Sequence, residues 1–262
     1  MIELYNDDCM KVLKTMADQS VDCVITDCPY HIVSGGCRTN DGRNIGGIFT
    51  NDECGGMLSH RKKSACNSIS SVEAGKLFDH NDIEFSEWLP EVYRVLKDGT
   101  HCYIMINARN LKDLWVEAEN VGFTFQNLLV WDKGNSTPNK WYMQAYELIL
   151  MLRKGRARNI NNMGTSNIIR VPNIVRTKAH PTEKPYQLMQ VLIENSTNEG
   201  EVVLDPFMGV GGGGVACKLL NRRFIGVEID KKYYDIAYER IHGKPQNDTL
   251  KQMSIFDLLG ID

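Results

Sequence analysis

Residues 202–214 read Val-Val-Leu-Asp-Pro-Phe-Met-Gly-Val-Gly-Gly-Gly-Gly, a short apolar run followed by a glycine-rich stretch. This pattern predicts a buried strand that ends at Asp205, a tight turn, and a helix that begins near Val215. Glycines at such a turn let a ligand approach the backbone, because no Cβ stands in the way. Glu228 closes the next predicted strand, where a carboxylate accepts hydrogen bonds from both hydroxyls of a ribose. The stretch therefore predicts a site for a cofactor that contains adenosine.

The glycines alone admit two other interpretations. Gly209, Gly211 and Gly214 also have the spacing of a dinucleotide-binding turn, which would indicate a nicotinamide-dependent oxidoreductase. That fold needs several more strands after the turn, whereas only residues 215–262 follow it here. An ordinary tight turn between a strand and a helix is the remaining alternative. The late position of the turn argues against the nicotinamide interpretation.

Short β-branched runs and amphipathic stretches recur along the rest of the chain, which is typical of a mostly parallel sheet with helices on both faces. We expect one doubly wound α/β domain over residues 1–262. The predicted strands are Ile2–Tyr5, Val21–Thr26, His101–Asn107, Phe125–Trp131, Glu147–Leu152, Val202–Asp205 and Phe224–Glu228. The predicted helices are Met10–Met16, Phe85–Leu96, Leu111–Val121, Tyr186–Ser196, Val215–Asn221 and Tyr233–Ile241.

Two segments depart from this pattern. Residues from about 31 to 82 are polar and lack periodicity, so we expect a long loop or insert that serves as a lid or a DNA contact. Residues from about 153 to 179 carry several arginines and lysines and no acidic residue. In a chain with a net charge of −3, this segregation favours contact with phosphate, and a solvated basic loop is the alternative.

The composition excludes several classes of protein. The net charge of −3 argues against a protein that coats nucleic acid by bulk attraction. No apolar run is long enough to span a bilayer, and the eight cysteines lack paired spacing, so we expect a cytoplasmic protein with reduced thiols and no membrane partner. Cys37, Cys54 and Cys66 share one loop-like region, but without a Cys-x-x-Cys pair we expect no metal.

A second motif follows the predicted strand at residues 21–26, which ends in Asp27-Cys28-Pro29-Tyr30. The carboxyl ends of strands in an open α/β sheet collect ligand-binding groups. An aromatic amine is a poor nucleophile, because its lone pair is delocalised into the ring. The Asp27 carboxylate and the Cys28 carbonyl would accept its hydrogens and free that lone pair, while Tyr30 offers a face on which an extruded base stacks. Taken alone, the tetrapeptide is also an ordinary turn after a strand.

Together the two motifs resemble those of the amino-group DNA methyltransferases of the β arrangement, in which the catalytic motif precedes the cofactor motif. The resemblance covers nearly the whole chain. Residues 27–30 match the family's Asp-Pro-Pro-Tyr, residues 205–211 match Asp-Pro-Phe-x-Gly-x-Gly, and residues 180–185 match His-Pro-Thr-x-Lys-Pro. Cys28 replaces the first proline, so the carbonyl is kept while some rigidity of the turn is lost.

The resemblance implies S-adenosylmethionine as the methyl donor and a flipped base of double-stranded DNA as the acceptor. Asp8 would reach toward the cofactor adenine, and Thr182 and Lys184 would meet its methionine end. The implied catalytic residues are Asp27, Cys28, Pro29 and Tyr30. The implied cofactor-binding residues are Asp8, His180, Thr182, Lys184, Asp205, Phe207, Gly209, Gly211 and Glu228.

The family's fold is a single α/β domain with a seven-stranded, mostly parallel sheet and a circularly permuted order of motifs. The strand at residues 147–152 would be the antiparallel one, and the strands that end at Asp205 and Asp27 would lie side by side. The family places its recognition segment before the His180 motif. We therefore assign phosphate contacts to Arg153, Arg156, Arg158, Arg170 and Arg176.

Aspartate at position 27 favours adenine N6 as the target, because a serine is commoner there in the related cytosine-N4 enzymes. Cytosine N4 remains an alternative, as does a DNA-binding protein of this fold without turnover. A nucleophilic Cys28 would indicate methylation of a carbon and is a weaker alternative. The resemblance leaves open a homodimer and a restriction-endonuclease counterpart.

Overall fold

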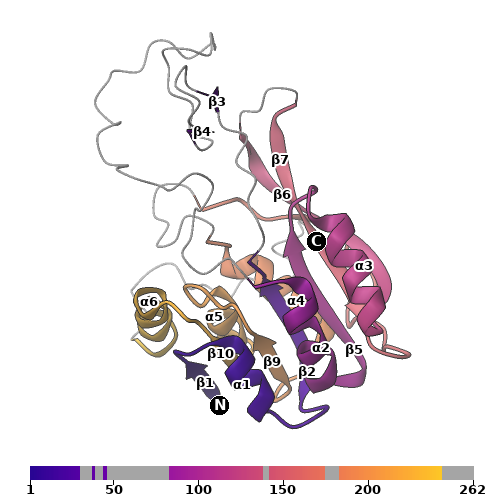
Figure 1. Cartoon of the computed structure of the whole chain (residues 1–262), viewed down its shortest axis with the longest axis vertical. Helices are drawn as coiled ribbons and strands as arrows, with labels where there is room; N and C mark the ends of the chain where they lie inside the picture. The colour runs from indigo at the N-terminus through magenta and orange to yellow at the C-terminus, as the bar shows by residue number, and fades with distance from the viewer. Residues whose placement is uncertain (30–36, 39–43, 46–82, 138–141, 175–182, 244–262) are drawn as a thin grey trace. The chain divides into compact units, whose positions relative to one another are not determined.

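The structure is a computed structural model that describes residues 1–29, 37–38, 44–45, 83–137, 142–174 and 183–243 (Figure 1). The chain divides into two compact units, of which the larger comprises Met1–Cys28 and Glu84–Asp262 and the smaller comprises Pro29–Ile83. In the smaller unit, β3 (Cys37–Arg38) and β4 (Asn44–Ile45) form an antiparallel pair. This unit contains the residues from about 31 to 82.

The larger unit is built on one eight-stranded sheet with the order β1-β10-β9-β2-β5-β7-β6-β8. β7 runs antiparallel to both of its neighbours, and the other seven strands are parallel to one another. The strands, in sheet order, are β1 (Ile2–Tyr5), β10 (Arg223–Val227), β9 (Val202–Asp205), β2 (Val21–Asp27), β5 (Leu96–Ile106), β7 (Gln144–Arg153), β6 (Thr124–Thr137) and β8 (Ile168–Arg170).

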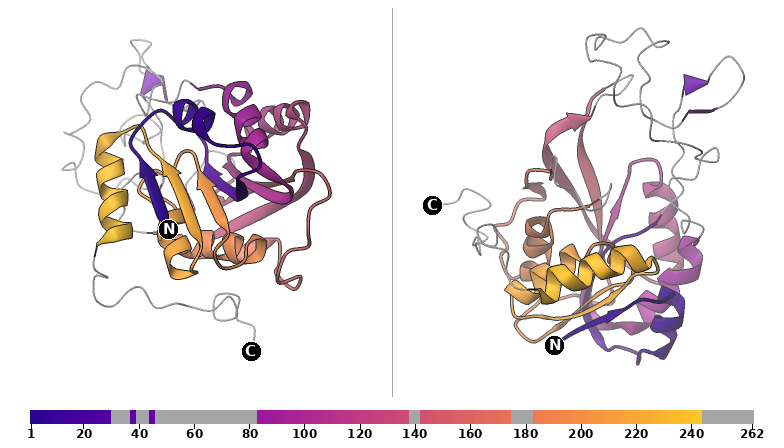
Figure 2. Two further views of the ribbon diagram at one scale, coloured as in Figure 1. Left: turned by 90° about the horizontal axis from the view of Figure 1, so that it is seen from below. Right: turned by 90° about the vertical axis from the view of Figure 1, so that its left-hand side faces the viewer.

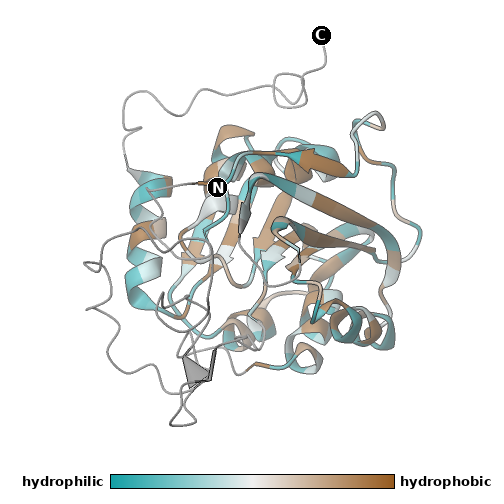
Figure 3. Cartoon of the chain, turned by 90° about the horizontal axis from the view of Figure 1, so that it is seen from above, coloured by the Kyte–Doolittle hydropathy of each residue, from teal (hydrophilic) through white to brown (hydrophobic). Residues whose placement is uncertain are grey.

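Three helices cover each face of this sheet (Figure 2). One layer contains α1 (Cys9–Thr15), α2 (Phe85–Val95) and α3 (Leu111–Val121). The other contains α4 (Tyr186–Ser196), α5 (Gly212–Leu219) and α6 (Lys231–His242). Apolar strands run through the middle of the unit, whereas the outer helix α6 is largely hydrophilic (Figure 3). Burial on both faces explains why the central strands read as continuous apolar runs.

Capping residues set the helix boundaries. The side chain of Asp8 accepts a hydrogen bond from the Met10 backbone N–H at the start of α1, and Asp230 caps α6 in the same way. Gly122 ends α3 in the left-handed conformation at φ 115°. These local signals are why the predicted helices agree with the observed ones to within a few residues.

The strand count differs from the expectation, because β8 adds an eighth strand at the edge of the sheet. Its three residues pair with β6 and bury Ile169. The run is too short to produce a periodic signal, and it lies inside the segment predicted as a basic loop. Pairing with the open edge of β6 supplies the hydrogen bonds that make it a strand. The antiparallel orientation of β7 is as the resemblance implied.

The chain changes its direction across the sheet between β9 and β2. From β2 it continues to β5 on one side, and from β9 it continues to β10 on the other. The two strands pair directly, with Cys23 opposite Val203 and Val24 opposite Leu204, which confirms that the Asp27 and Asp205 strands are neighbours. Ligands in open α/β sheets bind in the crevice at such a switch point. Of the helices in the described ranges, none has the length and apolar character to cross a membrane.

Candidate active site

The carboxyl ends of the parallel strands meet at one edge of the sheet, which we call the carboxyl edge. Asp205 ends β9 there and is buried. Its Oδ1 accepts hydrogen bonds from the Thr26 hydroxyl at 2.8 Å and from the Phe207 backbone N–H at 3.1 Å. Burial raises the pKa of Asp205 to about 7, against the lowering effect of these two donors. Asp205 thus ties the turn after β9 to the neighbouring strand β2.

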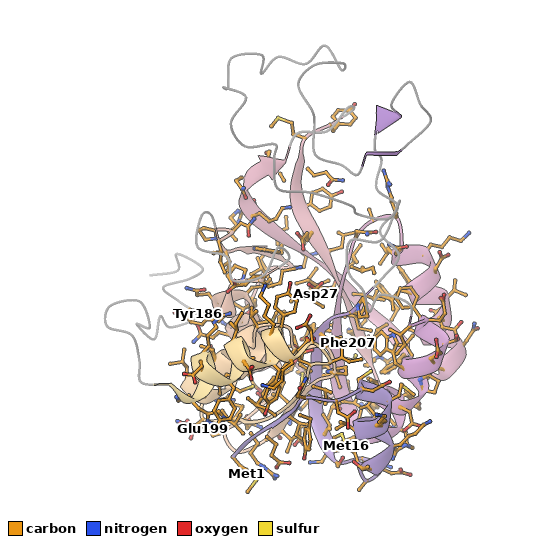
Figure 4. All side chains as sticks on the ribbon, turned by 60° about the vertical axis from the view of Figure 1, so that its left-hand side comes forward. Met1, Met16, Asp27, Tyr186, Glu199 and Phe207 are labelled. Atoms are coloured by element: carbon orange, nitrogen blue, oxygen red, sulfur yellow. The ribbon has the colours of Figure 1, made fainter. Side chains whose placement is uncertain are left out.

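Asp27 ends β2 on the adjacent strand, and 23% of its side chain is exposed, so its carboxylate can be reached from solvent. Lys184 Nζ lies 2.7 Å from Asp27 Oδ2 and 3.2 Å from Glu147 Oε2, and Lys133 Nζ lies 3.5 Å from Glu147 Oε1. Burial raises the pKa of Asp27, while Lys184 lowers it and Glu147 raises it further. Figure 4 labels Asp27 near Phe207 and far from Met16 and Glu199.

Cys28 is buried, and its thiol points at the Met105 carbonyl oxygen at 3.9 Å. Burial, with the charge of Asp27, raises the pKa of this thiol well above its ordinary value. A protonated, buried thiol does not act as a nucleophile, which argues against methylation of a carbon through Cys28. Pro29 begins the smaller unit and is partly buried, and Tyr30 lies outside the described residues.

The glycine run serves two different purposes. Gly209 has φ 52°, and a Cβ there would meet no atom within 4 Å, so its backbone faces open space. Gly211, at φ 78°, and Gly214 instead let α5 pack on α6, because a Cβ on them would lie 2.9 Å from the Ala237 side chain and 2.4 Å from the Ile241 side chain. Only the first of these glycines therefore offers room for a ligand at its own Cβ position.

Glu228 follows β10 at the same edge. Its carboxylate accepts hydrogen bonds from the Gly209 backbone N–H at 3.0 Å and from the Asp230 backbone N–H at 2.8 Å. Asn6, after β1, donates to the Glu228 carbonyl oxygen at 2.9 Å. Asp8 lies two residues further on at the start of α1. The structure thus brings Asp8, Gly209 and Glu228 to neighbouring strand ends, as the sequence motifs required.

Phe207 lies in the turn after β9 and packs edge-on against Trp88 of α2, with ring centroids 5.2 Å apart. Trp88 is fully buried, so it fixes the ring of Phe207 from the side of the helix layer. Sequence reasoning missed Trp88, Lys133 and Glu147. The signal for Glu147 was its position as the one charged residue before the apolar run 148–152, and nothing in the sequence marked the other two.

The predicted basic segment is divided between the two edges of the sheet. Arg153 pairs with His101 of β5. It is four residues from Ile149, which is opposite Met105 and hence level with Asp27. At 3.3 Å per residue, roughly 13 Å separates the two levels. Arg156 and Arg158 follow Arg153 at that far end. We call this end the amino edge.

Arg158 already has protein partners at the amino edge. Its guanidinium lies 2.6 Å from Glu201 Oε2 and also donates to the Ser196 carbonyl oxygen. Arg170 lies on β8 opposite Asp132, close to the carboxyl edge. Its Nε lies 3.8 Å from Asp132 Oδ2, and 71% of its side chain is exposed. The predicted site residues Arg176, His180 and Thr182 lie outside the described residues.

The doubly wound sheet, its switch point and the paired motifs define a class I methyltransferase architecture. The family model for DNA methylase matches residues 21–239, and the chain belongs to this family. A type II methyltransferase of Streptococcus pneumoniae, M2.DpnII, is 29% identical over 94% of this chain and 91% of its own length.

Two solved structures share the fold. The complex of M1.HpyAVI with SAM has a TM-score of 0.64 and 25% identity, and the match covers 92% of this chain and all of that one. The cytosine-N4-specific PvuII DNA methyltransferase has a TM-score of 0.66 at 14% identity and covers 95% of this chain and 88% of its own. This likeness concerns the fold alone.

Proposed function

We propose that this DNA methylase transfers a methyl group from S-adenosylmethionine to the N6 amino group of adenine in double-stranded DNA, after the base leaves the helix. The observation that carries the proposal is the position of the Asp27 carboxylate. It stands at the end of β2, directly beside the β9 turn with its cofactor motif. A base acceptor and a methyl-donor site would meet there.

The residues present fit an adenosine-containing methyl donor. The open space at Gly209 admits a ligand close to the backbone, and Glu228 lies beside it. Each carboxylate oxygen accepts more than one hydrogen bond, so Glu228 can hold the turn and still accept from ribose hydroxyls. Asp8 would face the adenine end, and Asp205 and Phe207 would line the floor of the site.

Catalysis would depend mainly on alignment. When bound, S-adenosylmethionine supplies an electrophilic methyl group, so the chain's own residues need only present a lone pair at near-attack distance. Asp27 would accept one amino hydrogen and the Cys28 carbonyl the other, with the base stacked on Tyr30. The amine nitrogen would gain the methyl carbon as the sulfur–methyl bond of the donor breaks and its electron pair returns to sulfur. The amine would then give up one proton, which Asp27 is placed to receive.

The DNA would approach the carboxyl edge, since Asp27 lies there. Among the arginines proposed for phosphate contact, the geometry favours Arg170 over Arg153, Arg156 and Arg158. The β6–β7 hairpin also extends past this edge, because β5 ends at Ile106 opposite Leu148 while the hairpin continues (Figure 1). Its described end exposes three large apolar side chains. They are Tyr142, Met143 and Tyr146.

Aspartate at position 27 supports adenine over cytosine as the target base. The type II relative supports a restriction endonuclease as the functional counterpart of this chain. A DNA-binding protein without turnover is the competing proposal. The one observation that supports it is the altered Asp-Cys-Pro-Tyr turn, in which Cys28 replaces a proline.

The experiment is to incubate the protein with unmethylated duplex DNA and radioactive S-adenosylmethionine, then separate the nucleosides. We expect N6-methyladenine at one short sequence, which sequencing of methylated genomic DNA from expressing cells would identify. N4-methylcytosine would overturn the adenine assignment. DNA binding without any transferred label would support the non-catalytic alternative.

A further inference from the structure

Four alternately charged side chains form a row at the carboxyl edge, which we call the charge row. It consists of Asp27 from β2, Lys184 from the segment before α4, Glu147 from β7 and Lys133 from β6. Successive members lie 2.7, 3.2 and 3.5 Å apart, as the closest charged atoms are measured. The side chains of Lys184 and Lys133 are only 7% and 9% exposed. Two positive and two negative charges thus neutralise one another in a mostly buried place.

We propose that Lys184 is a positioning residue for Asp27, and that its ammonium group holds Oδ2 so that Oδ1 is presented to the target amine. The proposal rests on the proposed function and deepens it. Among the described residues, Asp27 Oδ1 makes no hydrogen bond, whereas Oδ2 is held by Lys184 at 2.7 Å. The resemblance had placed Lys184 at the methionine end of the cofactor, which is a different role with different consequences.

Lys184 is itself fixed from both sides. Glu183, the preceding residue, forms an ion pair at 2.8 Å with Arg240 of α6. Pro185, the following residue, has φ −60° and starts α4. A Cβ at Gly212 would lie 3.3 Å from the Lys184 carbonyl oxygen, so α5 packs closely on this backbone. The ammonium group therefore has little freedom to follow a different partner.

Glu147 and Lys133 are the other two members of the charge row. A buried lysine beside a single carboxylate would neutralise it, but Glu147 shares the Lys184 ammonium and Lys133 balances Glu147. Burial raises the pKa of Glu147, but Lys184 and Lys133 together lower it. The lowered pKa favours the charged form of Glu147, and at Asp27 the charge of Lys184 opposes the effect of burial.

The same contacts predict how Asp27 titrates. The charged or titratable groups that face it are Lys184, Glu147, the buried Asp205 on the next strand and the Cys28 thiol. Removal of Lys184 takes away the cation that opposes burial, so the pKa of Asp27 would rise. Removal of the Glu147 charge takes away a like charge, so the pKa of Asp27 would fall.

The test compares Lys184→Met, Lys184→Arg and Glu147→Gln with the wild type. The dissociation constant of S-adenosylmethionine is measured by calorimetry, and the rate of DNA methylation is measured from pH 5 to 9. In a plot of rate against pH, the acid limb is the rise of the rate on the low-pH side. For Lys184→Met we expect this limb to move to higher pH by about one unit or more, because an opposite charge at this distance shifts a carboxyl pKa by roughly 1–3 units. The cofactor dissociation constant should change less than about threefold, because the positioning role has the cation facing Asp27 and not the cofactor.

Two further variants test the direction in which the acid limb of the rate moves. Glu147→Gln should move the acid limb to lower pH, and Lys184→Arg, which keeps the charge, should restore most of the wild-type profile. Lys154→Met is the matched control, because Lys154 is an equally buried lysine at the amino edge. It should leave the acid limb where it is in the wild type.

A readout without catalysis keeps the two proposals separable. The carboxyl carbon signals of ¹³C-labelled aspartates are followed by NMR across the same pH range, with Asp27→Asn to assign Asp27. An Asp27 titration midpoint that is unchanged in Lys184→Met would overturn the positioning role. Tenfold weaker binding of the cofactor by this variant, with an unmoved acid limb, would overturn it as well. Absence of methyl transfer by the wild type would remove the proposed function alone. The NMR titration would still show whether Lys184 controls the pKa of Asp27.

Discussion

Lys184 and Lys154 are both buried lysines, yet they stand at opposite edges of the sheet and have different partners. Lys154 Nζ donates to the carbonyl oxygens of Tyr93 at 2.6 Å and of Leu96 at 2.7 Å, and it lies 4.6 Å from the centre of the Tyr93 ring. Lys184 lies between two carboxylates. A cation that satisfies backbone carbonyls holds a turn in place, whereas a cation between carboxylates controls their charge.

Acidic side chains at the two edges also differ in the direction of their pKa shifts. At the carboxyl edge, burial raises the pKa of both Asp27 and Asp205. At the amino edge, burial would raise the pKa of Glu201, but the hydrogen bond and charge of Arg158 lower it. The amino edge therefore uses its charges for stability, whereas Asp27 and Asp205 at the carboxyl edge are acids whose charged form is costly. Perturbed acids of this kind are concentrated at functional sites.

The largest expected effect separates these two groups of acids. Asp27→Ala should lower the rate of methyl transfer by about a hundredfold or more, because one acceptor of the target amine is lost. Binding of S-adenosylmethionine should change little. Single-turnover methylation and calorimetry measure the two quantities. Glu201→Ala is the control, and it should lower stability while each folded molecule keeps its rate. Near-wild-type turnover by Asp27→Ala would contradict the assignment.

The next largest effect is the dependence of folding stability on pH that Asp205 causes. Its pKa in the folded protein is raised from 3.8 to about 7, so the folded state binds this proton more tightly than the unfolded state. Its contribution to stability is fully present below about pH 4 and is lost as the pH rises toward 7. Between pH 5 and 7 the loss should be about 2 kcal/mol, at about 1.4 kcal/mol per pKa unit.

Asp205→Asn should remove this pH dependence while it keeps an acceptor for Thr26. Urea unfolding of the variant and the wild type at half-unit steps of pH gives the difference. A difference that stays constant from pH 5 to 8 would show that Asp205 has an ordinary pKa.

A smaller effect is expected at Glu228. Glu228→Ala should weaken the binding of S-adenosylmethionine by roughly tenfold or more, because a hydrogen bond to a charged group contributes about 1.5–3 kcal/mol. Glu199, an exposed glutamate near the amino edge, supplies the control variant Glu199→Ala. Calorimetric titration of both variants tests the ribose role. An equal dissociation constant for the two would remove it.

The smallest effect distinguishes the two groups of arginines. Arg170→Ala should reduce the salt slope of DNA binding by about one and weaken all sequences alike, as expected for one phosphate contact. Arg158→Ala should leave the slope unchanged and lower stability, since Glu201 would lose its partner. Affinity for cognate and scrambled duplexes across a salt series measures both. The opposite result would place the DNA at the amino edge.

Much of this architecture could be predicted from local patterns. The strand Val202–Asp205 and the helix Leu111–Val121 were predicted at their observed bounds, because apolar periodicity and capping residues are local signals. β8 was missed, since three residues carry no period. Gly211 was predicted to bind the cofactor, and the structure adds that the space of its missing Cβ is taken by α6, which comes later in the chain.

The sequence by itself determined most of the helices and strands, the two motifs and the family to which they belong. Only the tertiary structure decided which charges face one another. Asp27 and Lys184 are 157 positions apart, and no sequence period encodes such a pair. The register of β7 likewise placed Arg153 and Glu147 at opposite edges of the sheet, although six positions separate them. The physical reason is that periodicity reports which face of an element is buried, whereas an ion pair depends on how distant elements are stacked and aligned.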